Sequence, residues 1–215
     1  MAERIAMLGG TFNPVHLAHL RSAVELGEAL ALDRVHMVPC HVPPHRDEPA
    51  TSAVDRLAML KAGIDGASGL LADDRELKRD GPSWSLDTLR SLREEYGPDV
   101  RLVMAIGDDA FERLDQWRAP AALFDYAHLV VIARPGHKLS LPEELGEWLK
   151  ARHAADPAAL FDDAPAGRWL RLSLPSPMAI SSTDIRARLC AGDSIRFLVP
   201  RAVERYIRDH GLYDQ

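Results

Sequence analysis

The chain has 215 residues, of which 47% are hydrophobic and 27% are charged, and its formal net charge is −6. This composition is typical of a soluble globular protein, while the negative net charge offers no basic surface for nucleic acid or for a membrane. No apolar run approaches the ~20 residues that cross a bilayer, and two cysteines are too few for a disulfide framework or a zinc site. We therefore expect one cytoplasmic domain over residues 1–215, in which any anion-binding site is built locally from helix ends and a few basic side chains.

Short apolar runs alternate with helical patterns along the chain. The runs that predict strands are residues 5–8, 34–39, 70–72, 101–106, 128–133 and 168–172. The helical patterns follow the first and fourth of these runs and also cover residues 52–61, 86–96 (with Ser85 as the expected cap), 143–153, 182–189 and 197–213, whereas residues 156–167 are typical of a loop. Strands separated by helices favour an α/β fold, a doubly wound, Rossmann-like parallel sheet with helices on both faces.

The stretch 9–19, Gly-Gly-Thr-Phe-Asn-Pro-Val-His-Leu-Ala-His, leaves the first predicted strand and opens a helix. Its two glycines allow a ligand to approach the backbone closely, and the helix start offers free N–H groups and the positive end of its dipole to an anion. His16 and His19 are three residues apart and share one helix face. Taken alone, two histidines at this spacing are more often surface or packing residues than ligands.

A second helix start lies near the end of the chain, at residues 180–186, Ile-Ser-Ser-Thr-Asp-Ile-Arg. Ser181 or Ser182 can cap this helix, and Asp184 three residues after Ser181 resembles a capping box. A well-capped helix is the simpler interpretation. The functional interpretation adds hydroxyl and N–H donors beside Arg186, whose guanidinium can grip a phosphate bidentately.

The distinctive residues follow the ends of predicted strands. Residues 9–19 follow the first strand, 43–46 the second, 107–109 the fourth and Arg134 the fifth. In an open parallel sheet, ligands bind outside the carboxyl ends of the strands. We therefore expect these residues to form a single site.

Residues 9–19 and 180–186 together resemble the two motifs of the HxGH nucleotidyltransferase superfamily, with Asn13 where Asp is common and Ala18 where Gly is common. The resemblance implies that the histidines hold the phosphates of ATP during adenylyl transfer and that the second motif stabilises the leaving pyrophosphate. It implies catalytic roles for His16, His19 and Arg186, which would supply charge and hydrogen-bond donors. The ATP-binding residues it implies are Gly9, Gly10, Thr11, Phe12, His16, His19, Gly107, Asp109, Arg134, Ile180, Ser181, Ser182, Thr183 and Arg186.

The middle of the chain resembles the bacterial nicotinate-nucleotide adenylyltransferase family in residues 43–46, 81–89 and 106–109 and in Trp117. The resemblance implies that ATP and nicotinate mononucleotide give deamido-NAD and pyrophosphate in NAD biosynthesis, with Mg²⁺ carried mainly by phosphates and water and no protein ligand named for it. The substrate-binding residues that the resemblance implies are His45, Arg46, Trp84, Ser85, Leu86, Asp109, Trp117 and Arg118.

The chemistry of these side chains fits a pyridine mononucleotide. Trp117 can stack on the ring, the helix start at Ser85 and Leu86 can donate N–H groups to its carboxylate, Arg46 can take the phosphate and Asp109 a ribose hydroxyl. Each also has a structural interpretation. Trp117 could be a core anchor and Arg46 a solvated loop charge, while Ser85 and Asp109 could each cap a helix.

Three rival functions remain open at the level of sequence. Nicotinamide-mononucleotide adenylyltransferase shares both motifs. Pantetheine-phosphate adenylyltransferase is a smaller relative that lacks the long middle region. A nucleotide sensor without turnover should have lost His16, His19 or Arg186, and all three are present.

Overall fold

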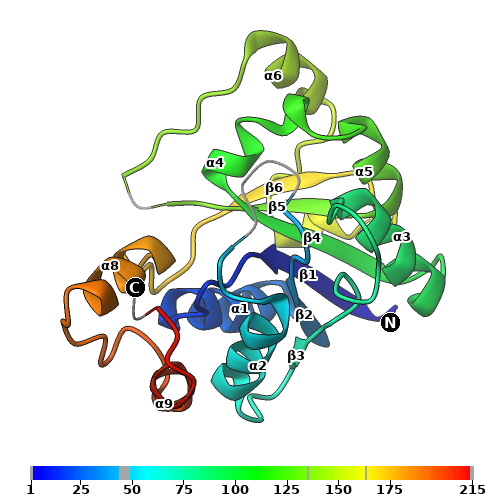
Figure 1. Cartoon of the computed structure of the whole chain (residues 1–215). Helices are drawn as coiled ribbons and strands as arrows, with labels where there is room; N and C mark the ends of the chain where they lie inside the picture. Colours follow the sequence, from blue (N-terminus) through cyan, green and yellow to red (C-terminus); the bar gives the residue numbers. More distant parts are fainter. Residues whose placement is uncertain (1, 44–48, 135, 163, 214–215) are drawn as a thin grey trace.

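The computed structural model describes residues 2–43, 49–134, 136–162 and 164–213. Its centre is a six-stranded sheet in the order β3-β2-β1-β4-β5-β6, and all neighbouring strands are parallel (Figure 1). The strands are β1 (Arg4–Gly10), β2 (Arg34–Pro39), β3 (Leu70–Ala72), β4 (Arg101–Gly107), β5 (His128–Ile132) and β6 (Trp169–Leu172). The doubly wound α/β prediction is confirmed. Because β1 lies between β2 and β4, the strand order reverses there, and the crevice for a ligand opens at this point.

Both faces of the sheet are apolar. Successive strand residues point to opposite faces, so a run such as Ile5-Ala6-Met7 contributes to two separate cores. The first core also contains Val35, Val103, Val130 and Leu170, and the second contains Val38, Leu102, Met104, Leu129 and Val131. Near-continuous apolar strands are expected when helices cover both faces of a parallel sheet.

The helices divide between these two cores (Figure 1). The first core is covered by α1 (Leu17–Leu30), α2 (Ala53–Ile64), α7 (Pro157–Leu160), α8 (Ser182–Cys190) and α9 (Arg201–Asp209). The second is covered by α3 (Ser85–Tyr96), α4 (Asp108–Phe111), the 3₁₀ turn η1 (Leu114–Gln116), α5 (Pro120–Tyr126) and α6 (Glu143–Lys150). Among the residues described, none of these helices is both long and apolar enough to cross a membrane.

Three local predictions were wrong. The expected loop 156–167 contains the short helix α7, because the Asp156 side chain accepts a hydrogen bond from Ala159 N–H at 2.8 Å and caps it. The last helix begins only at Arg201, since Phe197 has a left-handed φ of 66° that no helix accommodates. The cap of α3 is Trp84, whose carbonyl accepts from Asp87 and Thr88, so that Ser85 is already helical.

Candidate active site

Two adjoining cavities lie at the carboxyl ends of the strands. The larger, of about 780 Å³, is lined by residues that follow β1 and β5 and by the start of α8. The smaller, of about 210 Å³, lies between the loop after β1 and the start of α3. Thr11 and Pro43 line both, so the cavities meet at these two residues. Together they can hold one large polar ligand beside one small flat ligand.

The two histidines of the first motif stack on each other at the mouth of α1. Their ring centroids are 3.6 Å apart with an interplanar angle of 21°. His16 is the N-cap of α1 and is only 4% exposed, and its backbone N–H donates to His19 Nδ1 at 3.4 Å. His16 Nδ1 is buried and has no hydrogen-bond partner among the described residues. Both rings line the larger cavity, so a bound ligand could complete this unsatisfied group.

Both imidazoles are uncharged in the ligand-free protein at neutral pH. Burial lowers the pKa of His16 to about 4. Burial, and then the proximity of His16, lower the pKa of His19 to about 3. The charge that the resemblance implies for these side chains during the reaction is therefore not present in the unliganded site. They bring N–H donors, and a bound polyphosphate would be needed to favour the imidazolium form.

The second motif, residues 180–186, is hydrogen-bonded directly to the first motif, residues 9–19. Ser181 caps α8, with its hydroxyl accepting from Asp184 N–H at 3.1 Å, which confirms one of the two expected caps. Ser182 Oγ donates to Pro14 O at 2.9 Å, and Arg186 Nη1 donates to Asn13 O at 2.7 Å. The α8 start and the α1 start thus face one cavity, although their residues lie about 170 positions apart in the chain.

The end of β4 carries two acidic side chains with different surroundings. Asp109 pairs with Arg134 at 3.1 Å, and a Cβ on Gly107 would come within 3.0 Å of Asp109 Oδ1, so a glycine suits this position. Asp108 is fully buried and binds Arg171 at 2.9 and 3.0 Å and the Arg134 N–H at 2.8 Å. Burial opposes the charge of Asp108, but the hydrogen bond from Arg171 and the backbone N–H hold its pKa below the usual range. The sequence placed Asp108 within the expected site segment 107–109 but indicated no role for it apart from that of Asp109.

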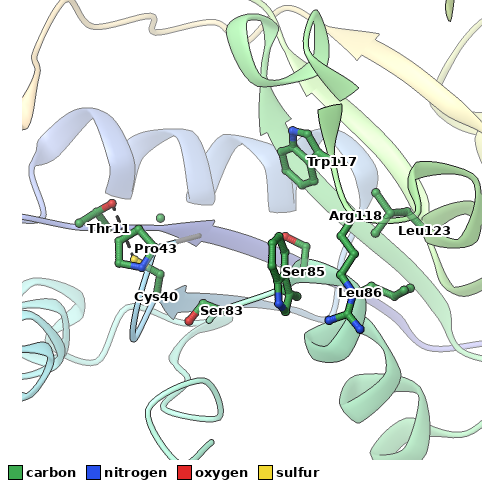
Figure 2. A pocket seen from close by; sticks show the side chains of 11 residues that line it. Thr11, Cys40, Pro43, Ser83, Ser85, Leu86, Trp117, Arg118 and Leu123 are labelled. Carbon is green, nitrogen blue, oxygen red and sulfur yellow. Dashed lines mark hydrogen bonds between the residues drawn. The ribbon is translucent and has the colours of Figure 1, made fainter. Parts of the chain in front are cut away.

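The smaller cavity has an aromatic wall and a helix start facing it (Figure 2). Trp117 stands on one side, and Ser85 and Leu86 in the first turn of α3 lie across from it. The backbone N–H groups of a first helical turn have no partner within the helix. Arg118 reaches over the Trp84 ring at 5.5 Å and approaches Asp87 at 3.5 Å, which adds a cation at this helix start.

Most of the expected site residues come together in these cavities. The larger is lined by Thr11, Phe12, His16, His19, Gly107, Arg134, Ile180, Ser181, Ser182, Thr183 and Arg186. The smaller is lined by Gly10, Thr11, Trp84, Ser85, Leu86, Trp117 and Arg118. Gly9 and Asp109 line neither cavity, and His45 and Arg46 lie outside the described residues.

The C-terminal segment also reaches the site, although the sequence analysis assigned no chemistry to this segment. Tyr213 lines the larger cavity and donates its hydroxyl to Asn13 Oδ1 at 2.6 Å. Burial raises the pKa of Tyr213 to about 12, so its phenol stays protonated and can donate. Asn13 thus uses the oxygen acceptor that it shares with the more common Asp, and no feature of the sequence near Tyr213 indicated this contact.

This fold, with two helix starts gathered around one polar cavity, is suited to a protein that binds a nucleotide by its phosphates. A family model described as cytidylyltransferase-like matches residues 7–188, which include both helix starts. The chain is thus a nucleotidyltransferase by class.

Two similar proteins show to which family of nucleotidyltransferases the chain belongs. A protein of Chromohalobacter salexigens described as a probable nicotinate-nucleotide adenylyltransferase is 60% identical over 98% of this chain and 95% of the relative. One of Pseudomonas aeruginosa with the same description is 48% identical over 99% and 98% of the two chains. The chain belongs to the nicotinate-nucleotide adenylyltransferase family.

Solved structures agree on the fold. The Plasmodium falciparum nicotinic acid mononucleotide adenylyltransferase in complex with NaAD matches with a TM-score of 0.74 at 18% identity, over 99% of this chain and 98% of that one.

Proposed function

We propose that this chain transfers the adenylyl group of ATP to nicotinate mononucleotide, giving deamido-NAD and pyrophosphate. The observation that carries the proposal is the pair of cavities that meet at Thr11 and Pro43. The larger suits a nucleoside triphosphate, and the smaller, with Trp117 and a helix start, suits a pyridine ring that bears a carboxylate. Their junction is then the place where the two phosphate groups meet.

The reaction needs no protein nucleophile. A phosphate oxygen of the mononucleotide attacks the α-phosphorus of ATP, a new phosphorus–oxygen bond forms, and the α–β bridge breaks as pyrophosphate leaves. Catalysis is then positioning and charge stabilisation. His16 and His19 donate N–H groups to the phosphates, while Arg186 and the start of α8 stabilise the charge on the departing pyrophosphate.

A divalent cation would accompany ATP in this proposal. The described part of the chain contains no group of three or more His, Cys, Asp or Glu side chains that could hold a metal ion. Phosphate oxygens and water are the ligands that Mg²⁺ commonly keeps, and we assign it no protein ligand.

The experiment is a direct assay. Purified protein is incubated with ATP, Mg²⁺ and nicotinate mononucleotide, and pyrophosphate release is followed while the dinucleotide is identified by chromatography and mass. We expect stoichiometric release of both products. A parallel reaction with nicotinamide mononucleotide should be much slower. Equal rates with the two mononucleotides would transfer the assignment to the amide-using rival, and the absence of both products would leave a nucleotide sensor.

A further inference from the structure

Arg56 differs from the other charged side chains that are buried among the described residues, because it forms no ion pair with a described carboxylate. It is 1% exposed. The other three each pair with an arginine: Glu25 with Arg21, Glu76 with Arg79 and Asp108 with Arg171.

The Arg56 guanidinium instead binds backbone carbonyl groups of three separate segments. Nη1 donates to Thr11 O at 2.8 Å, Nη2 to His41 O at 3.2 Å and Nε to Thr51 O at 3.4 Å. Thr11 belongs to the loop after β1, His41 to the loop after β2, and Thr51 to the approach to α2. One planar side chain on α2 therefore ties three loops together.

These three segments surround the junction of the two cavities. Thr11 lines both cavities and Thr51 lines the larger. Cys40, the neighbour of His41, lines the smaller, and its thiol lies 3.8 Å from Thr11 Oγ1 (Figure 2). Arg56 thus lies directly behind the wall at which the two ligands would meet.

Arg56 Nη1 also contacts Cys40 Sγ at 3.9 Å. A buried cation that has dipolar partners but no paired carboxylate is expensive for a folded protein. In a low dielectric the same cation attracts a nearby anion more strongly than it would in water. The anions of the proposed reaction are phosphates, and in that proposal they meet at the cavity junction that Thr11 lines. A substrate phosphate is therefore a natural counter-charge for Arg56.

We propose that Arg56 is a positioning residue for adenylyl transfer: it holds the loops after β1 and β2 and the start of α2 around the cavity junction, and its uncompensated charge favours the phosphates bound there. The inference rests on the proposed function. The wild-type assay separates the two, since an inactive wild type overturns the function, whereas active wild type with unaltered Arg56 variants overturns only this inference.

Two variants separate the effect of the planar, multi-donor guanidinium from the effect of its positive charge. Arg56→Lys keeps the charge, but one ammonium group cannot reach three carbonyls on three segments. We expect kcat to fall tenfold or more with KM for ATP changed less than threefold. Arg56→Gln also removes the charge, and we expect a similar loss of kcat together with a fivefold or greater rise in KM for both substrates. Rates are referred to the folded fraction, measured by circular dichroism.

Arg93 provides a matched control. Its guanidinium also donates to backbone carbonyls, those of Gly97, Pro98 and Val100, at the amino end of β4 and thus at the opposite edge of the sheet from the cavities. Arg93→Lys should lower the melting temperature without changing kcat or either KM. Wild-type kcat in folded Arg56→Lys would overturn the positioning role, and unchanged KM in folded Arg56→Gln would overturn the role of the charge.

A measurement on the wild-type protein covers the case in which the Arg56 variants do not fold. In ¹⁵N-edited NMR spectra, the guanidinium resonances of Arg56 should shift when pyrophosphate is added, because the anion binds next to the carbonyls that they contact. Those of Arg93 should stay in place. Arg56 resonances that do not respond at saturating pyrophosphate would overturn the inference.

Discussion

At the scale of single residues, the stacked pair His16 and His19 is the most unusual feature of the site. Two imidazoles with centroids 3.6 Å apart cannot both be protonated without strong repulsion, and burial already favours the neutral form of each. Neutral rings that offer N–H donors to a phosphate cost less to bury than cations do. The pair is therefore organised for a ligand that carries the charge itself.

His19→Ala tests this arrangement. Loss of one preorganised donor to a charge that develops in the transition state typically lowers turnover about 10²–10³-fold, and we expect a fall of this size in kcat. The melting temperature should change little, because the ring lines a cavity. His210→Ala is the control, since its ring stacks on Tyr206 on the exposed surface of α9. Near-normal kcat in folded His19→Ala would remove the histidines from the mechanism.

Trp117→Ala tests the smaller cavity. The indole can stack equally on a nicotinate and on a nicotinamide ring, so its loss should lower kcat/KM for both mononucleotides by a similar factor. The ratio of the two kcat/KM values should persist, because it depends on the N–H groups at Ser85 and Leu86. These groups can donate to both oxygens of a carboxylate, whereas the NH₂ group of the amide faces them as another donor. Charge-assisted hydrogen bonds contribute about 1.5–3 kcal/mol each, so two of them give roughly hundredfold selectivity or more.

The measurement is kcat/KM for both mononucleotides in the wild type and in the variant. Trp148→Ala serves as the control, because this indole packs on Phe124 and lines neither cavity. A collapse of the acid-to-amide ratio in Trp117→Ala would show that the ring itself, and not the helix start, selects the substrate.

At the scale of elements, α8 serves both the core and the site. Ile185 is fully buried in the core while Ser181, Ser182 and Arg186 line the cavity, so the proposed anion site requires a helix start that is held firmly. The cap at Ser181 and the bonds from Ser182 and Arg186 to the Asn13-Pro14 segment provide this.

Ser181→Ala should therefore affect stability and ligand affinity together. Loss of a serine N-cap costs about 1 kcal/mol, and fraying of the α8 start should raise KM for ATP several-fold. Asp156→Ala removes a comparable cap from α7, where the side chain accepts from Ala159 N–H at 2.8 Å, and should lower stability alone. Urea unfolding and steady-state kinetics on both variants check this, and an unchanged KM in Ser181→Ala would limit the serine to a structural role.

At the scale of the whole molecule, three histidines with lowered pKa values couple folding to pH: His16 and His128, which are buried, and His19, which is half-buried. His128 is fully buried, its ring bridges Ala164 O and Arg168 N–H, and burial lowers its pKa to about 4, as it does for His16 and, more strongly, His19. In the unfolded chain all three should titrate near 6.5. Between pH 6.5 and pH 4 the unfolded state therefore binds more protons than the native state.

It follows that the free energy of unfolding is at its full value above pH 6.5 and falls as the pH drops towards 4. Glu76 opposes this change, because burial raises its pKa and its protonation favours the native state just above pH 4.5. We expect a net loss of roughly a few kcal/mol between pH 7 and pH 5, since each pKa unit corresponds to about 1.4 kcal/mol. Urea unfolding at the two pH values measures it, and a smaller difference in His128→Asn should identify one contributor. Equal stability at both pH values would contradict the prediction.

The sequence by itself determined the strands, their parallel arrangement and the two helix starts. Near-continuous apolar runs such as residues 101–106 fit only strands that are buried on both faces, and cap residues such as Ser181 act within one turn of the chain. The clustering of residues 9–19 with Gly107 and Arg134 also followed, because parallel strands end at one edge of the sheet. The place of residues 180–186 in the same site was implied only by the family resemblance.

Only the tertiary structure decided which distant groups complete the site. The bonds from Arg56 to Thr11 and from Tyr213 to Asn13 join residues 45 and 200 positions apart. The neutrality of His16 and His19 follows from burial by other segments, which no local pattern records. Such features depend on distance and desolvation in the folded protein, and residue type and spacing along the chain carry neither.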